Sequence, residues 1–159
     1  MREIEFRAKR TDNNKWVYGH YVQGLDFENK PINSSIVRNI TTINPVDKTI
    51  KQDIYEVDIN TLGQYTGLKD KNDTKVFESD IIRMHYFFEN YDPSSLGAFE
   101  DEAEIIGVVK CDLIDGFYVE TVDDHSRCYL QWIEEPTEEL EVLGNIYDNP
   151  EWLEGENND

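Results

Sequence analysis

Four side chains near residue 125 have the types needed for thiol-based nucleophilic catalysis: Asp123, Asp124, His125 and Cys128. In such a site an imidazole accepts the thiol proton and a carboxylate orients the imidazole. On a strand, Cys128 would lie three positions from His125, and residues an odd number of positions apart project from opposite faces. The spacing therefore favours a turn that leads into a strand, and the sequence predicts no catalytic residues.

Two groups of oxygen-bearing side chains have ligand types suited to a divalent cation. One is Glu100, Asp101, Glu102 and Glu104, and the other is Asp70, Asn72 and Asp73. Neither group lies in a twelve-residue loop with a central glycine and a closing glutamate, which calcium binding of the EF-hand type requires. Solvated turns explain both groups, so no metal site is predicted.

The only cysteines, Cys111 and Cys128, lack the paired spacing of a structural zinc site. The histidines His20, His85 and His125 are scattered along the chain and complete no ligand set. Both thiols are expected to act as small apolar fillers or partly exposed bystanders. The sequence indicates neither a metal nor a cofactor.

The charge of the chain is concentrated in its C-terminal half. Residues 1–80 contain 12 basic and 13 acidic side chains, whereas residues 81–159 contain 3 basic and 21 acidic ones. Such a surface repels phosphate backbones, so direct nucleic-acid binding by the C-terminal half is disfavoured. Three uses of the acidity stay open: solubility alone, contact with a basic host or phage protein, or imitation of nucleic acid to inhibit a host DNA-binding enzyme.

The chain is long and apolar enough for one ordinary domain or two small ones. It has 159 residues, of which 42 are Ile, Leu, Val or Phe and 19 are aromatic. That composition supports a packed core despite the formal charge of −19. No window approaches the roughly 18 apolar residues of a membrane span, and the N-terminus has no apolar signal segment. We expect a soluble, cytoplasmic protein without a membrane partner.

Aromatic residues are the best candidates for an interface with another subunit or partner. Tyr86, Phe87 and Phe88 are consecutive, and a single sheet cannot hide all three rings on one face. Trp16 and Tyr18 lie in an aromatic, β-branched run. A stacking platform for single-stranded nucleic acid also needs a basic groove, which only the N-terminal half could offer. Packing in the core and between subunits is the expected use, so we predict a homo-oligomer.

The N-terminal segments read as short strands. Residues 3–8 alternate, with Ile4, Phe6 and Ala8 on one face, and a turn at 11–14 leads to the strand 15–22. Gly, Pro, Asn and Ser predict a loop over residues 24–35. Further short strands are expected at 36–40 and 54–57, around a turn near residues 44 and 45.

The C-terminal segments predict a small barrel. Tight turns at 70–73 and 78–80 precede a strand at 81–84, a pattern common in SH3-like barrels, with Asp80 as a turn cap. Residues 89–104 are polar and acidic and read as a loop or insertion. Strands follow at 105–111, 116–120, 128–133 and 142–147, and Asn149 and Pro150 predict the start of a short helix.

The predicted fold is therefore mainly β. An SH3-like barrel, built around residues 62–146, carries an N-terminal β-hairpin and a short C-terminal helix. The corresponding regions are 1–60, the hairpin region, and 61–159, the barrel region with its insertion at 89–104.

Three segments together resemble the YopX family of phage and prophage proteins. They are IEFRAKR with KWVYGHY, LGQYTGLKDKNDTKVFESDIIR, and VLGNIYDNPEWL. The family usually has glycine at the positions of Asp73 and Ser79; Asp tolerates left-handed backbone, and Ser79 predicts that its position does not require positive φ here. The resemblance implies a small phage-encoded protein that self-associates and has no established activity. It supplies no catalytic residues, and it favours a non-catalytic accessory or interaction role.

Overall fold

The structure, a computed structural model, describes residues 3–38, 53–92, 97–114, 116–130 and 140–153. For residues 86–92 and 97–103 it describes the backbone only. The regular structure in these ranges is antiparallel β with two short 3₁₀ turns, which confirms the mainly β prediction. The chain divides into two compact units, residues 1–67 and residues 68–159, each with its own buried apolar cluster.

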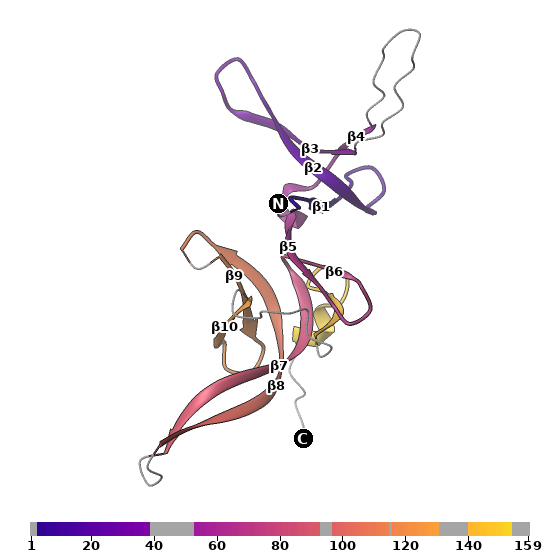
Figure 1. The fold of residues 1–159 in the computed structure, drawn as a ribbon. Coiled ribbons are helices and arrows are strands. Elements are labelled where there is room, and N and C mark those ends of the chain that lie inside the picture. Colours follow the sequence, from indigo (N-terminus) through magenta and orange to yellow (C-terminus); the bar gives the residue numbers. More distant parts are fainter. Residues whose placement is uncertain (1–2, 39–52, 93–96, 115, 131–139, 154–159) are drawn as a thin grey trace, which may run out of the picture. The chain divides into compact units, whose positions relative to one another are not determined.

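The first unit is an antiparallel sheet. Its strands are β1 (Phe6–Lys9), β2 (Trp16–Leu25), β3 (Pro31–Arg38), β4 (Asp53–Glu56) and β5 (Gly63–Lys69). They lie in the order β4-β3-β2-β1-β5 (Figure 1). The turn at 11–14 is as predicted, and Asn14 has the left-handed φ of 58° that such a turn needs. The strand predicted at 15–22 is found as β2, which begins at Trp16 and continues to Leu25.

One face of this sheet forms the core of the first unit. Ala8, Val17, Ile36 and Val57 are buried together, and Phe6 and Tyr55 pack against them. The short 3₁₀ helix η1 (Ile59–Thr61) is fixed beside β1, because the Thr61 hydroxyl accepts from the Lys9 amide at 2.8 Å. Phe6 and Ala8 lie as the alternation predicted, but Ile4 is exposed.

The predicted loop over residues 24–35 is wrong. Strand β3 begins at Pro31, so only residues 26–30 connect it to β2. Strand β1 pairs with β2 only as far as Gly19, and β4 pairs with β3 only from Ser35 onward. Beyond these positions β2 and β3 pair only with each other among the described strands, as a two-stranded hairpin arm (Figure 1).

The second unit contains a five-stranded sheet. Its strands are β7 (Asp80–Asp92), β8 (Gly97–Asp112), β9 (Gly116–Thr121), β10 (Arg127–Tyr129) and β11 (Glu141–Asn145). The short strand β6 (Lys75–Phe77) is not part of this sheet and pairs with β5. The sheet order is β10-β9-β8-β7-β11. Its core contains Ile82, Met84, Val109, Val119 and Leu140.

Two finer predictions for this region are not confirmed. Each sheet begins and ends on a different strand, so the described strands do not close into the predicted SH3-like barrel. In place of a C-terminal helix the chain makes one 3₁₀ turn, η3 (Pro150–Leu153), in which the Trp152 amide donates to the Asn149 carbonyl at 3.3 Å. Four residues are too few for a stable α-helical turn, and Pro150 begins the 3₁₀ turn instead.

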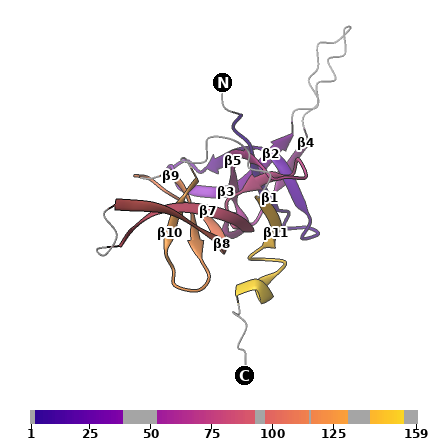
Figure 2. The same ribbon diagram turned by 60° about the horizontal axis from the view of Figure 1, so that its bottom comes forward.

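The predicted acidic loop at 89–104 is also wrong for residues 89–92 and 97–104, while residues 93–96 lie outside the described part of the chain. Strands β7 and β8 pair continuously from Ile81 opposite Val108 to Asp92 opposite Gly97. Strand β9 pairs with β8 only from Gly107, so the ribbon continues past β9 and β10 (Figures 1 and 2). Polar composition predicted a loop, whereas pairing between β7 and β8 makes the described part of this segment a β-ribbon.

The turn between β6 and β7 corrects another expectation. Ser79 has a φ of 70°, so this position does adopt the left-handed backbone that glycine tolerates best. The Ser79 amide donates to the Val109 carbonyl at 2.8 Å, and its carbonyl accepts from the Ile146 amide at 3.1 Å. These two hydrogen bonds hold the residue in place. Asp73 has a φ of 65°, which agrees with the expectation that Asp tolerates the left-handed backbone at a position where the family usually has glycine.

Replacing Ser79 with glycine is expected to stabilise the second unit by about 1 kcal/mol, because it removes the crowding between a Cβ and the left-handed backbone. Asp73→Gly should gain less, since Asp tolerates this conformation and its carboxylate contacts the Lys69 ammonium at 2.6 Å. Urea denaturation followed by circular dichroism measures both changes. A Ser79→Gly variant that is less stable than the native protein would contradict the backbone argument.

Candidate functional site

The predicted interface residues Trp16 and Tyr18 lie on the outer face of the first sheet, opposite its core. On this face β1 pairs Arg7 with Tyr18 and Lys9 with Trp16. The Trp16 ring is contacted by the Arg7 guanidinium at 4.7 Å and the Lys9 ammonium at 5.4 Å from its centroid. Trp16 is half-buried in this stack, and Tyr18 is exposed. Arg7 and Lys9 are themselves buried, so the cations and the Trp16 ring pack against one another and Tyr18 is the exposed member of this group.

The backbones of Tyr86, Phe87 and Phe88 lie in the β7–β8 ribbon, opposite Ala103, Glu102 and Asp101. Their side chains are outside what the structure describes. Their interface role therefore stays a prediction.

Apolar residues continue across the outer face of the first sheet. His20 on β2 lies opposite Val37 on β3, and Val37 lies opposite Ile54 on β4. Ile54 is exposed, and so is Val22, two residues beyond His20 on β2. An exposed apolar surface of this kind is typical of a contact site for another protein.

The hairpin arm exposes three more large apolar side chains that sequence reasoning missed. Leu25 and Ile32 are more than half exposed, and Phe27, in the turn, is fully exposed. The prediction of a loop over these residues hid the pattern. A signal was present, because Val22, Leu25 and Ile32 flank a short stretch rich in turn-forming residues.

The turn that carries Phe27 is held by its own hydrogen bonds. The Asp26 carboxylate accepts from the Glu28 and Lys30 amides, both at 2.8 Å. The Asp26 amide donates to the Lys30 carbonyl at 2.9 Å, and Asn29 has a left-handed φ of 60°. A turn fixed in this way presents Phe27 with little conformational entropy left to lose on binding.

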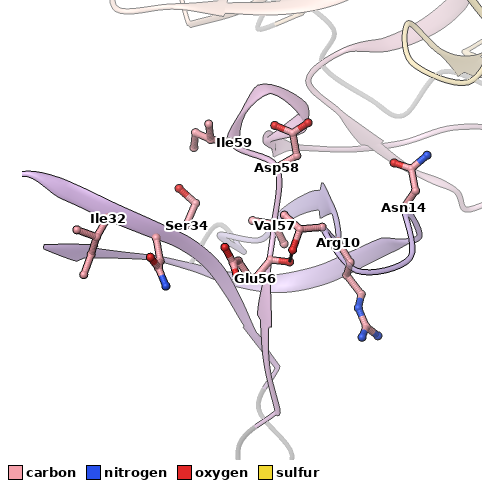
Figure 3. Close-up of a pocket in the computed structure, with 10 residues that line it drawn as sticks. Arg10, Asn14, Ile32, Ser34, Glu56, Val57, Asp58 and Ile59 are labelled. Carbon is pink, nitrogen blue, oxygen red and sulfur yellow. Dashed lines mark hydrogen bonds between the residues drawn. The ribbon is translucent and has the colours of Figure 1, made fainter.

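A pocket of about 480 Å³ lies at the base of the same arm (Figure 3). It forms where the chain leaves β4 and turns towards η1, beside the part of β3 that β4 does not cover. Ile32, Val57 and Ile59 give it apolar walls, and Arg10, Glu56 and Asp58 are among its polar residues. Ile32 is 60% exposed and Ile59 is 46% exposed, so two of its apolar walls face solvent.

The cluster around His125 forms a turn, as the spacing predicted. The Asp124 carboxylate accepts from the Ser126 hydroxyl at 2.6 Å and from the Thr121 hydroxyl at 2.5 Å. These hydrogen bonds lower the pKa of Asp124 to about 2. His125 is exposed, and its Nδ1 atom lies 3.8 Å from Glu120 Oε1. The Asp124 carboxylate thus stabilises the turn and does not orient the His125 imidazole.

Cys128 belongs to the core of the second unit. It is buried, and burial raises the pKa of its thiol, as does the negative charge of Asp124. A raised pKa keeps the thiol protonated, which is the opposite of what a nucleophile needs. Cys111 is exposed. Both positions fit the structural role that the sequence predicted for them.

The carboxylate of Asp70 fixes the turn between β5 and β6. It accepts from the Asn72 and Thr74 amides at 2.8 Å and from the Val142 amide at 3.1 Å. Burial opposes ionisation of this group, but the three amide donors outweigh it, so the pKa of Asp70 lies below its ordinary value. Asp70 therefore holds β11 to this turn and is not a free cation ligand.

An Asp70→Asn variant is expected to lose about 1.5 kcal/mol of stability near neutral pH, because its amide presents a donor where the native group accepts. The native pKa is depressed, so the contribution of Asp70 is complete above its ordinary value of 3.8 and is lost as the pH falls through the folded value. The difference between variant and native protein should therefore shrink below about pH 4. Urea denaturation of both proteins over this range measures it; a constant difference would contradict the linkage.

The two units differ sharply in charge. Residues 1–67 contain nine basic and nine acidic side chains, and residues 68–159 contain six basic and 25 acidic ones. Several acids of the second unit meet the few bases there: Lys71 contacts Glu141 at 2.8 Å, and Lys110 contacts Glu120 at 2.5 Å. The hairpin arm and the pocket thus belong to a unit without net charge.

The described part of the chain offers neither a metal site nor a membrane-spanning helix. There, no three His, Cys, Asp or Glu side chains gather in a way that could hold a metal ion. Within the same residues, no helix has the length and apolar character needed to cross a membrane.

Comparison with known proteins supports the fold and gives the family. The crystal structure of protein EF1440 from Enterococcus faecalis is similar to this chain with a TM-score of 0.50 and 20% identity, covering 96% of this chain and 99% of that one. No curated protein matches the sequence. The sequence model of the family described as YopX protein matches residues 5–154. Because this match spans nearly the whole chain, the protein belongs to the YopX family.

Proposed function

We propose that this protein is a non-catalytic phage accessory protein that acts in the host cytoplasm by binding other proteins, and that it self-associates. The observation that carries the proposal is the hairpin arm, which exposes Val22, Leu25, Phe27 and Ile32 around a turn fixed by Asp26. Large apolar side chains on a preorganised element are typical of protein contact sites.

The charge distribution supports contact through the first unit. Two copies of the second unit carry the same strong negative charge, so their approach is opposed at low salt. The first unit has no net charge, and its apolar outer face and arm can meet another surface without that repulsion. Association through the first unit is therefore the arrangement that electrostatics favours.

The non-catalytic part of the proposal rests on what the candidate catalytic groups do. The carboxylates of Asp70, Asp80 and Asp124 accept hydrogen bonds that hold turns, and the Cys128 thiol is buried with a raised pKa. Groups engaged in this way are not poised for proton transfer or nucleophilic attack.

Sedimentation velocity over a range of protein concentrations, at low and at raised salt, tests self-association. A sedimentation coefficient that rises with concentration, and rises more at raised salt, is expected, because salt screens the repulsion between the acidic units. A single monomeric species under every condition would exclude self-association. Turnover of a substrate that is abolished by one substitution without loss of folding would exclude the non-catalytic role.

The charge of the second unit favours one alternative function, imitation of nucleic acid to inhibit a host DNA-binding enzyme. The observation is the excess of 25 acidic over six basic side chains in residues 68–159. Capture of such an enzyme from host lysate at low salt, and its release at raised salt, would support this alternative. Recovery of the protein alone at both salt concentrations would count against it.

A further inference from the structure

Strand β2 has an open edge along the hairpin arm. Strand β1 covers that edge only as far as Gly19, and no other described strand pairs with residues 20–25 on that side (Figure 1). We propose that two copies of this chain associate by antiparallel pairing of these edges, so that their arms join into one four-stranded sheet. The inference rests on the proposed self-association and names the segment that performs it.

Three residues of the arm direct their backbone N–H and C=O groups to this open edge. The Lys15 carbonyl accepts from the Arg10 amide at 3.0 Å, so Lys15 faces the side of β2 on which β1 lies. These directions alternate from residue to residue along a strand. Tyr21, Gln23 and Leu25 therefore face the same side as Lys15, beyond the end of β1.

The pairing on the other side of β2 gives the same result. Gln23 lies opposite Ser34 on β3, and the Ser34 carbonyl accepts from the Val57 amide at 2.9 Å, on the side of β3 away from β2. In an antiparallel pair, two opposite residues either exchange hydrogen bonds or both face away from each other. The Gln23 N–H and C=O groups thus point away from β3, to the open edge.

This edge lacks the features by which proteins usually prevent pairing between chains. Charged side chains and proline protect many edge strands, but residues 20–25 include neither. Other open edges differ, since β3 begins with Pro31 and β4 begins with Asp53 and ends with Glu56. A two-stranded hairpin is also only marginally stable in water, so the arm would gain stability from further strands.

The edge is complementary to a second copy of itself. One antiparallel register uses all three open residues: Gln23 lies opposite Gln23 of the second copy, and Tyr21 of each copy lies opposite Leu25 of the other. In this register Val22 lies opposite Gly24, so the branched side chain meets a residue that has none. The contact has twofold symmetry and uses both edges at once, which gives a closed dimer.

The charges of the first unit permit this approach. Residues 20–25 bring no like charges together, because they contain neither acidic nor basic side chains other than His20. Residues 1–67 as a whole have nine basic and nine acidic side chains. Val22 is 49% exposed and Leu25 is 53% exposed, so pairing would also remove apolar surface from water.

The first test places a charge at the centre of the contact. Gln23 is exposed, so Gln23→Lys should fold like the native protein, which thermal unfolding checks. Twofold pairing sets the two new ammonium groups directly opposite each other, so we expect Kd for association to rise at least about fivefold. Sedimentation equilibrium at about 0.15 M salt measures it, because screening is incomplete over the short distance within such a pair. Asn33→Lys is the matched control, since Asn33 is also exposed but lies on β3.

A mixing experiment tests the symmetry of the contact. Gln23→Glu should weaken association in the same way as Gln23→Lys, because each variant faces its own charge. A mixture of the two variants sets opposite charges against each other and should associate more tightly than either variant alone. A mixture no tighter than the separate variants would exclude the register centred on Gln23.

Disulfide formation tests the register directly. In the Cys111→Ser background, Gln23→Cys should give a covalent dimer under mild oxidation, because paired residues that exchange hydrogen bonds have Cα atoms about 5.5 Å apart, within disulfide range. Asn33→Cys in the same background should stay monomeric on a non-reducing gel. In the joined sheet the two Asn33 positions are three strand spacings apart, roughly 14 Å.

The outcomes separate the two proposals. If the native protein associates and Gln23→Lys associates equally well, edge pairing is wrong while self-association stands. If Asn33→Lys weakens association as much as Gln23→Lys does, or Asn33→Cys cross-links as readily as Gln23→Cys, the contact is not the β2 edge and the inference is also wrong. If the native protein is monomeric under every condition, both proposals fail.

Discussion

Replacing Gly107 with alanine is expected to destabilise the second unit by about 3 kcal/mol, near the upper end of the range for overpacked cores. Gly107 lies in the middle strand of the sheet, opposite Ile82 on β7 and Thr121 on β9. A Cβ atom there would lie 2.5 Å from the Glu120 carbonyl oxygen and 2.5 Å from Val119 Cγ1. A backbone oxygen cannot rotate away as a side chain can, so β9 would have to move.

Gly116→Ala is the control for this change. Gly116 has a left-handed φ of 73°, but an added Cβ would meet no atom within 4 Å. The Gly116→Ala variant should therefore lose only about 1 kcal/mol of stability, which is the cost of a left-handed backbone at a residue other than glycine. Urea denaturation followed by circular dichroism gives both values, and amide hydrogen exchange shows whether β8 and β9 lose protection. Equal losses for the two variants would contradict the crowding argument.

Asp80→Ala is expected to destabilise the same unit by a similar amount, about 3 kcal/mol. The Asp80 side chain is only 1% exposed, and its carboxylate accepts from the Phe77 amide at 2.7 Å. Alanine would leave that buried amide without its charged acceptor, and a buried donor that loses its partner also loses the solvation it would have had in water. The turn that holds Ser79 against Val109 would lose its support at the same time.

Two further variants make the Asp80 prediction specific. Asp80→Asn keeps one carbonyl oxygen for the Phe77 amide and should recover part of the lost stability. Asp123→Ala, at an exposed turn position, should change stability by no more than about 0.5 kcal/mol. Equilibrium denaturation of the three variants measures these differences. A loss below about 1 kcal/mol for Asp80→Ala would show that the buried hydrogen bond contributes little.

Local patterns in the sequence predicted the elements whose partners are near in the chain. The turn at Asp70–Asp73, the cap at Asp80 and the turn at Asp123–Ser126 depend on side chains that bond their own backbone, and all were found. The wrong predictions concern segments whose secondary structure depends on pairing with another strand. Residues 31–35 and 89–104 have loop-like composition, but pairing with a neighbouring strand makes the described part of each a β-strand.

The candidate site was predictable only in part for the same reason. Trp16 and Tyr18 stand out in any aromatic, β-branched run, and both lie on the outer face of the first sheet. Phe27 and Ile32 are recognised as exposed residues of a hairpin only once β3 is known to pair with β2. The position of the pocket depends on the point at which the chain leaves β4 after Glu56. Ser79 shows the limit of residue type as a guide, since its surroundings hold a left-handed backbone that serine itself disfavours.

Strand β5 crosses the boundary between the two units, which falls after Gly67. Gly63 and Gln64 pair with β1 in the first unit, and Leu68 packs against the core of the second. A gene exchange that joined either half to a foreign sequence at this point would cut through a strand that both halves need. The halves should therefore be inherited together, and recombination that preserves folding should exchange the whole reading frame.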